Sequence, residues 1–362
     1  MNNMNTDRRS FLKSTMLAAA GVAVGGAAAA QDSKPPKLDL KLGLDNFAVR
    51  NMKWKAPQLI DYAASLKTDS LFITDLGPFE KFDDAYLQDI RKLAADKGLQ
   101  IQLGSWSICP TSKAFKKDWG TAEEHLELGI RMAKALGSPV FRVILGTGED
   151  RKTEGGIEAR IADTVKVLKS KRSQAVDAGV KIAVENHAGD MQSWELVTLI
   201  EAAGKDYVGA NIDSGNACWT MEDPLENLEI LGPYIATSSL RDSMIWESKS
   251  GATVQWTAMG DGIVDFKTYF NRFKELCPSA PVHIETISGF PRELAYFNRD
   301  FWKTFPKARA SDLAKFVALA KKGKSIPPHR SADAKAEQDY QKDQIERSIK
   351  YCQDVLGLGL KG

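Results

Sequence analysis

Short apolar runs alternate with longer amphipathic stretches along most of the chain. Eight runs have the length and composition of buried strands: residues 41–47, 70–74, 100–105, 140–145, 180–184, 208–212, 235–240 and 282–284. Between them, apolar residues recur at helical spacing, as in 122–136 and 157–178. Because each strand is followed by a helix, or by a loop and then a helix, the pattern favours an α/β fold of the closed (β/α)8 type, a TIM barrel.

The C-terminal part departs from this alternation. Residues 290–305 are rich in aromatic side chains and are a candidate contact surface between copies of the chain. A Lys- and Pro-rich linker then precedes a charged helix predicted from about 334 to 355. Its apolar positions form one stripe, so we expect it to pack on the barrel, with a solvent-exposed tail as the alternative; the stripe contains Tyr340, Ile345, Ile349, Cys352 and Leu356.

The first thirty residues have the composition of a targeting segment. Two adjacent arginines precede Phe-Leu-Lys and an Ala- and Gly-rich apolar run that ends in Ala28-Ala29-Ala30. This resembles a twin-arginine export signal, which implies passage through the twin-arginine translocase and a periplasmic or otherwise exported mature protein. The run is too short for a membrane anchor. We therefore divide the chain into a signal peptide (1–30), a linker (31–40), the barrel (41–289) and a C-terminal helical extension (290–362).

Charge and cysteine content narrow the class of partner. The signal holds three of the 49 basic and one of the 47 acidic residues, so 46 of each remain and the mature chain is neutral. A neutral surface without basic runs provides no electrostatic footprint for nucleic acid. The cysteines are widely spaced, and we expect no disulfide framework in a domain of this size.

Acidic residues follow three of the predicted strands. Residues 180–184 end in Glu185, residues 208–212 end in Asp213, and residues 282–284 end in Glu285. In a parallel barrel these ends open at one mouth. Because converging carboxylates are costly to bury without a cation, the pattern predicts a shared hard divalent ion. Taken singly, each acid is also typical of a helix cap or a salt-bridge partner.

Several short motifs, in order along the chain, resemble the xylose isomerase-like barrels, the sugar phosphate isomerase and epimerase superfamily. These are Glu-Asn-His at 185–187, Ile-Asp-Ser-Gly-Asn at 212–216, Leu-Arg-Asp at 240–242, Gly-Asp-Gly at 260–262 and His-Ile-Glu at 283–285. The resemblance covers most of residues 41–289. It implies metal ligation by Glu185, Asp213 and Glu285, together with a histidine from strand seven. Here Ser239 stands where that histidine is expected.

The missing histidine leaves one ligand position open. Gln255, in the predicted loop 254–256, is the leading substitute because an amide oxygen suits a hard ion, with water second. His283 shares the strand face of Glu285 but should lie deeper in the barrel, so it ranks lower. Oxygen-rich ligation favours manganese or magnesium, and cobalt would also fit.

The resemblance further implies that two carboxylates act on a carbon next to a carbonyl. We expect Glu185 and Glu285 to be this acid/base pair, with the metal holding the substrate oxygens. The residues predicted to bind a small carbohydrate substrate near the mouth are Trp106, His187, Asn216, Arg241, Asp242 and His283. Core packing is the alternative for Trp106, and a structural role for His187.

The predicted function is a metal-dependent sugar isomerase or epimerase that works through an enediolate. Because sugar phosphates are scarce outside the inner membrane, an unphosphorylated sugar or keto-sugar is the favoured substrate. A lyase that eliminates the glycosidic group of a 3-keto-glycoside would use the same chemistry. A sugar-binding barrel without catalysis is the alternative from another class, whereas a trinuclear-zinc endonuclease needs more than the four histidines present.

Overall fold

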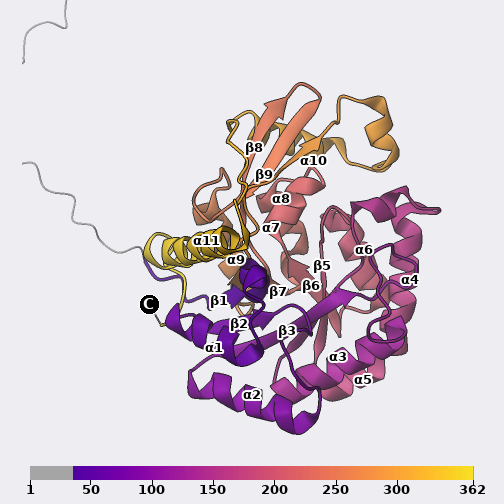
Figure 1. Ribbon diagram of the computed structural model, residues 1–362. Coiled ribbons are helices and arrows are strands. Elements are labelled where there is room, and N and C mark those ends of the chain that lie inside the picture. The colour runs from indigo at the N-terminus through magenta and orange to yellow at the C-terminus, as the bar shows by residue number, and fades with distance from the viewer. Residues whose placement is uncertain (1–35, 362) are drawn as a thin grey trace, which may run out of the picture. The chain divides into compact units, whose positions relative to one another are not determined.

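Eight parallel strands form the barrel that the alternating pattern predicts (Figure 1). The computed structural model describes residues 36–361. The strands follow one another around the sheet in the order β10-β1-β2-β3-β4-β5-β6-β7, and a bridge between Leu240 and Ile284 closes the circle. The strands are β1 (Leu42–Asp45), β2 (Ser70–Ile73), β3 (Gln100–Ser107), β4 (Val140–Ile144), β5 (Lys181–Glu185), β6 (Val208–Ile212), β7 (Ile235–Ser238) and β10 (Val282–Ile284).

Helices surround the barrel where the sequence has helical periodicity. The predicted helix 122–136 is α3 (Ala122–Leu136), which begins at a capping box made by Thr121 and Glu124 and ends at Gly137 in the left-handed conformation. The predicted helix 157–178 is two helices, α4 and α5, that meet at Lys171. The remaining helices on the barrel are α1 (Ala56–Ser65), α2 (Asp84–Asp96), α4 (Gly156–Ser170), α5 (Arg172–Ala178), α6 (Ser193–Ala203), α7 (Ser214–Trp219), α8 (Pro224–Leu231) and α9 (Phe266–Leu276). Short 3-10 helices follow β1 and β4, precede β7 and lie in the C-terminal part: η1 (Asn46–Met52), η2 (Gly148–Lys152), η3 (Gly232–Tyr234) and η4 (Arg299–Lys303).

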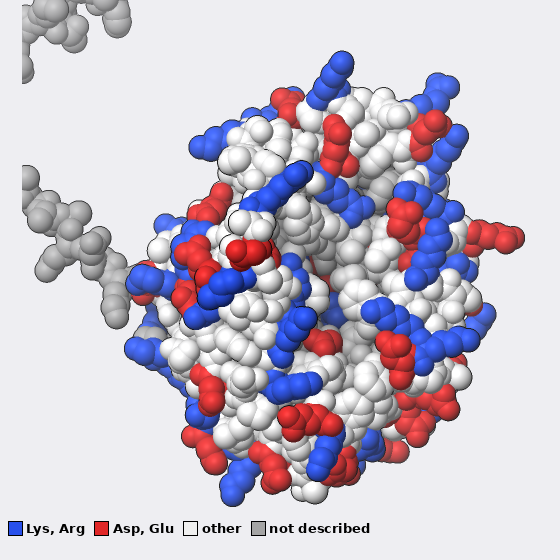
Figure 2. Space-filling model, in the orientation of Figure 1, with Lys and Arg blue, Asp and Glu red and all other residues white. Residues whose placement is uncertain are grey.

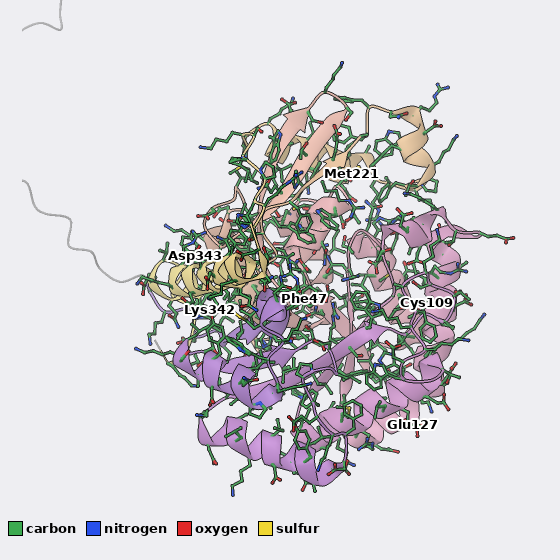
Figure 3. All side chains as sticks on the ribbon, viewed as in Figure 1. Phe47, Cys109, Glu127, Met221, Lys342 and Asp343 are labelled. Atoms are coloured by element: carbon green, nitrogen blue, oxygen red, sulfur yellow. The ribbon has the colours of Figure 1, made fainter. Side chains whose placement is uncertain are left out.

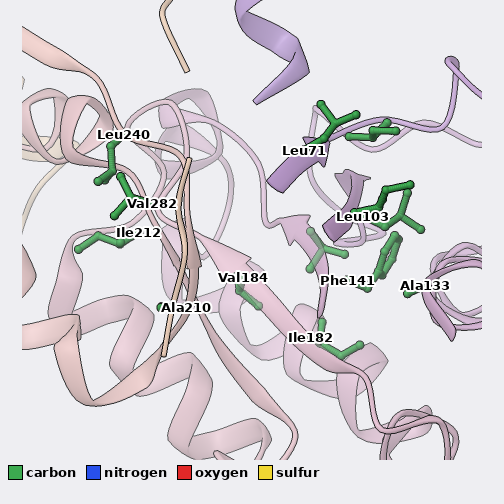
Figure 4. Packing of buried hydrophobic residues seen from close by; sticks show 14 of the residues in the cluster. Leu71, Leu103, Ala133, Phe141, Ile182, Val184, Ala210, Ile212, Leu240 and Val282 are labelled. Carbon is green, nitrogen blue, oxygen red and sulfur yellow. The ribbon is translucent and has the colours of Figure 1, made fainter. Parts of the chain in front are cut away.

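Apolar side chains from strands and helices fill the space between the two layers. Figure 4 shows Ile212, Leu240 and Val282 close together, and Phe141 near Ala133 of α3. The helix approaches β4 closely at Gly129, where a Cβ atom would lie 1.9 Å from the Phe141 ring. Glycine is therefore required at this position of α3 by packing.

A three-stranded antiparallel sheet is added to the barrel, with two strands between β7 and α9 and a third after β10. It consists of β8 (Asp242–Ser248), β9 (Gly251–Thr257) and β11 (Pro291–Leu294), in the order β11-β9-β8. Together with α10 (Ala310–Ala320) it encloses a second hydrophobic cluster, which includes Phe316 and Met221, the latter labelled in Figure 3. The aromatic segment 290–305 contributes Phe305 to this cluster and leaves Phe297 exposed.

The C-terminal helix α11 (Ala334–Asp354) packs on the barrel as expected. It lies beside η1 (Figure 1), and its Ile345, Ile349 and Cys352 are buried. Neither it nor any other helix within residues 36–361 has the length and apolar character needed to cross a membrane. All four cysteines are buried as free thiols. Basic and acidic side chains are interspersed on the face shown in Figure 2.

Candidate active site

A cavity of about 350 Å³ opens at the carboxyl ends of the barrel strands. Its wall combines charged side chains, among them Arg142, Arg241 and Glu285, with aromatic rings. A larger cavity of about 500 Å³ lies beside η2 and η4, but no strand-end acid reaches it. The mouth of the barrel is therefore the candidate active site.

The three strand-end acids meet behind this wall. The Nη2 atom of Arg241 donates hydrogen bonds to both Asp213 and Glu285. The amide nitrogen of Asn216 lies 2.6 Å from Asp213 Oδ2 and 3.2 Å from Glu185 Oε1. The convergence expected from the sequence is thus present, although only Glu285 lines the cavity itself.

A second arginine neutralises Glu185. Arg142 Nε lies 2.6 Å from Glu185 Oε2, and its Nη1 donates to the Ser105 carbonyl at 2.8 Å. Asn211 donates to the same carboxylate oxygen at 2.6 Å. Burial alone would raise the pKa of Glu185, but the charge of Arg142 and its hydrogen bond lower it below the usual value. Glu185 is therefore held as a buried anion.

The neighbouring acids are shifted the other way. Burial raises the pKa of Asp213 to about 8, against the opposing charge of Arg241. The pKa of Glu285 is raised by burial as well, and that of Asp45 is raised by burial and by the nearby Glu285. Removal from water thus outweighs the arginine charges at these positions.

The residues at the mouth do not fit the divalent ion predicted from the sequence. Each of the three acids already pairs with an arginine or an amide, and the guanidinium of Arg241 occupies the point where Asp213 and Glu285 meet. Ser239, in the position expected for a histidine ligand, donates its hydroxyl to Asp45 at 2.8 Å. Within residues 36–361, no group of three or more His, Cys, Asp or Glu side chains is arranged to hold a metal ion.

Gln255, the predicted substitute ligand, lies on a strand and not in a loop. It is on β9, opposite Met244 and Pro291, and its amide nitrogen donates to the Pro327 carbonyl at 3.0 Å. Side chains alternate along a strand, and the adjacent Trp256 faces the cavity, so Gln255 faces the other side of the small sheet. It does not join the carboxylates.

Two predicted substrate contacts are also structural. Asp242 is buried, and its carboxylate accepts hydrogen bonds from the backbone of Gly260 and Gly262, so it fixes the loop before α9. His283 lies inside the barrel, with its Nε2 atom 2.9 Å from Ser70 Oγ. Neither Asp242 nor His283 lines the cavity.

His187 and Trp106 do line the cavity and lie edge to face. His187 Nδ1 is 2.7 Å from the Gly146 carbonyl, which can only accept, so Nδ1 carries the proton and Nε2 has a free lone pair. No described residue bonds Nε2. Burial lowers the pKa of His187 to about 4, which keeps the ring neutral.

An aromatic wall completes the cavity, and sequence reasoning missed it. The rings of Trp219 and Trp256 stack with centroids 3.9 Å apart, and Phe290 meets both edge to face. The guanidinium of Arg292 lies 4.1 Å from the Trp219 centroid but does not line the cavity. The signal for this wall was the spacing of aromatics across 219–290, which only the inserted sheet brings together.

The sequence profile of the xylose isomerase-like TIM barrel family matches residues 60–305, more than half of the chain. The chain belongs to this family. Among curated proteins, the chain is similar to 3-oxo-isoapionate decarboxylase of Pectobacterium atrosepticum, with 20% identity over 63% of this chain and 78% of that protein.

Solved structures share the fold of this family member. A D-psicose 3-epimerase in the presence of D-fructose has a TM-score of 0.57 and 15% identity, covering 88% of this chain and all of the other. An L-ribulose 3-epimerase has a TM-score of 0.54 and 16% identity, with 87% and 96% covered. An IolI protein with a bound zinc atom has a TM-score of 0.53 and 16% identity, with 79% and 100% covered.

Proposed function

We propose that this protein is an enzyme that isomerises or epimerises a sugar or keto-sugar by moving a proton on a carbon next to a carbonyl. One observation carries the proposal: a carboxyl group, Glu285, and a neutral imidazole nitrogen, Nε2 of His187, line the same cavity at the mouth of the barrel. Such a pair can remove and return a proton. The family match and the epimerases among the solved neighbours support this reaction class.

The lining of the cavity suits a sugar ring. Trp256 and Phe290 offer an apolar surface to the C–H face of a pyranose or furanose, while Arg241 offers donors to hydroxyl and carbonyl oxygens. A volume of about 350 Å³ is within the range of small-molecule sites. The site therefore fits one sugar unit with polar groups on one side.

The geometry favours His187 over Glu185 as the partner of Glu285. The sequence pairs the two glutamates, but Glu185 is 1% exposed and lies behind Arg142 and Asn216. In the proposed reaction, one group takes the proton from the carbon and the electron pair moves to the carbonyl oxygen, giving an enediolate. The guanidinium of Arg241 is the positive charge beside that oxygen. The divalent ion that the sequence predicts is not part of the proposal, because the site does not fit it.

A lyase is the second candidate. The curated relative is by name a decarboxylase of a 3-oxo compound, and loss of carbon dioxide from such a compound passes through an enolate. Elimination of the glycosidic group of a 3-keto-glycoside begins with the same proton abstraction. The isomerase and the β-eliminating lyase need the same base to remove that proton, whereas a decarboxylase needs only an acid that protonates the enolate.

Deuterium incorporation tests the proposal and separates the two candidates. The full chain is incubated in D2O with unphosphorylated ketoses and 3-keto-glycosides, and the products are followed by NMR. Recovered sugar labelled next to the carbonyl indicates an isomerase or epimerase, and a released aglycone indicates a lyase. Tight sugar binding without exchange or release would leave the non-catalytic barrel and overturn the proposal.

Variants assign the roles. Glu285→Gln and His187→Gln are each expected to lower kcat by about 10²-fold or more, with the fold retained. Glu229→Gln, which removes an exposed carboxylate paired with Arg272 on the outside of the barrel, is the matched control and should leave kcat unchanged. Glu185→Gln separates direct from indirect action: a loss as large as that of Glu285→Gln would return Glu185 to the acid/base pair.

We also propose that the protein is exported, on the strength of residues 1–30, which lie outside the described residues. Changing Arg8 and Arg9 to Lys in the full chain should retain the protein in the cytoplasm, as cell fractionation would show. Export of the variant at the normal rate would contradict this. Export also favours an unphosphorylated substrate.

A further inference from the structure

Arg241 lies at the end of strand seven, between two of the three acids that were expected to bind a metal. Its side chain is 2% exposed, and one terminal nitrogen contacts both Asp213 and Glu285. We propose that this guanidinium is the built-in cation of the site and replaces a divalent ion, so that the protein works without a metal. The substrate part of this inference rests on the proposed function, whereas the metal part does not.

Neighbouring residues hold the Arg241 side chain in a fixed position. The Arg241 Cζ atom lies 4.3 Å from the centroid of the Trp256 ring. On another side is Gly215, where a Cβ atom would come within 2.5 Å of Arg241 Cγ. Trp256 is itself held by a hydrogen bond from Nε1 to the Gly215 carbonyl at 2.9 Å. An aromatic face, a glycine and two carboxylates thus position the guanidinium.

The groups around Arg241 that could bind a metal ion are already paired with other residues. Ser239 is turned to Asp45, and its oxygen accepts from Asn211 at 3.3 Å. The acids Asp213 and Glu185 are covered by Arg241 and Arg142 and do not line the cavity. A divalent ion placed among these acids would stand next to two buried guanidinium groups, and like charges at short range in a buried site repel strongly. Binding a metal would require the Arg241 guanidinium to move away from Asp213 and Glu285.

The guanidinium retains donors for a ligand. Arg241 Nε and Nη1 are buried and have no hydrogen-bond partner among the described residues, although Arg241 lines the cavity. Buried donors are rarely left unpaired. The Nε–H bond and the N–H bonds of Nη1 point to different sides of the guanidinium, so each nitrogen can donate to a different oxygen of a bound molecule. We assign these donors to oxygens of the sugar, among them the carbonyl oxygen on which negative charge develops.

Metal analysis of the full chain tests the inference directly. Purified protein is equilibrated with Mn²⁺ or Zn²⁺, separated from free ion by gel filtration, and its metal content is measured by mass spectrometry. We expect only trace metal and unchanged activity after treatment with EDTA. Stoichiometric metal, with activity lost to EDTA and regained on adding the ion, would overturn the inference.

A designed pair of substitutions provides the positive control. Ser239→His with Arg241→Ala frees Asp213 and Glu285 and adds an imidazole beside them, so this variant should gain stoichiometric Zn²⁺. Ser239→His alone keeps the guanidinium and should remain metal-free, and metal binding by this single variant would count against the inference. Circular dichroism establishes that both variants fold. Because the wild-type metal content is decisive without either variant, a failure to fold does not remove the test.

Arg241→Lys tests the guanidinium donors separately from the charge. An ammonium group keeps the positive charge but lacks the fixed planar arrangement of donors. We expect this variant to remain metal-free and to lose at least about tenfold in kcat/KM for a substrate found in the deuterium screen. Equal kcat/KM would show that these donors are not used. If no substrate is found, the proposed function fails while the metal measurement still decides whether Arg241 replaces the ion.

Discussion

Replacing Arg142 with Met is expected to destabilise the barrel by about 3–5 kcal/mol at pH 7. Arg142 is buried and makes two hydrogen bonds, one to Glu185 at 2.6 Å and one to the Ser105 carbonyl at 2.8 Å. Without the guanidinium, Glu185 keeps the amides of Asn211 and Asn216 but no directly paired positive charge. Most of the loss is therefore the cost of a buried, uncompensated carboxylate.

Urea unfolding followed by tryptophan fluorescence measures this loss, and the double variant Arg142→Met/Glu185→Gln provides the matched control. Because the amide introduced by Glu185→Gln carries no charge and can still accept from Asn211, the double variant should recover about 2 kcal/mol relative to Arg142→Met. The pH dependence gives a further check. In wild-type protein the lowered pKa of Glu185 means that its contribution is lost as the pH falls.

In Arg142→Met, by contrast, the pKa of Glu185 should rise above its unfolded value. The folded state would then bind a proton more readily than the unfolded chain, so the deficit should shrink as the pH falls toward about 5. A deficit below about 1 kcal/mol at pH 7 would refute the uncompensated-charge reasoning, since exposed ion pairs contribute stability in that range. A deficit that does not change with pH would refute it as well.

Three further predictions concern other parts of the molecule. Burial lowers the pKa of His125 to about 4, so only the unfolded chain takes up its proton near pH 6.5; wild-type protein should lose about 3 kcal/mol as the pH falls between these values, and His125→Gln should flatten that part of the unfolding profile. Gly129→Ala should cost about 1–3 kcal/mol in thermal unfolding because its Cβ atom meets Phe141, and adding Phe141→Leu should restore part of it; a stabilised Gly129→Ala would contradict the packing argument. Phe290→Ala should raise KM about tenfold with kcat unchanged, whereas a fall in kcat alone would place the ring in the chemistry and not in binding.

The barrel could be predicted because its signal is local. Each strand is a short apolar run, and parallel strands that alternate with helices have few ways to close. The inserted sheet was missed because the alternating pattern predicts a loop and then a helix after strand seven, and β8 and β9 occupy that interval. The residues that it carries, Gln255 and Trp256, were therefore read as loop, and the wrong one of the two was assigned to the site.

The convergence of Glu185, Asp213 and Glu285 could also be predicted, since strand ends of one barrel share a mouth. The group that neutralises these acids could not be predicted. The sequence shows that three acids need a cation and that Ser239 is a poor ligand, but it shows no distances, so Arg241 was placed on the substrate side of the mouth. The serine was interpreted as a gap to be filled by another ligand, whereas the arginine two residues later removes the need for one.

The small inserted sheet has its own hydrophobic cluster, separate from the interior of the barrel. Trp256, on the central strand β9, and Phe290, which precedes β11, form part of the mouth, while the acids and the arginines are anchored on or just after the barrel strands. Groups that select a molecule and groups that transform it thus belong to two packing units with little shared interior. Exchange of residues on the hairpin other than Trp256, which packs on Arg241, offers a route to new substrates that leaves the chemical machinery and the stability of the barrel in place.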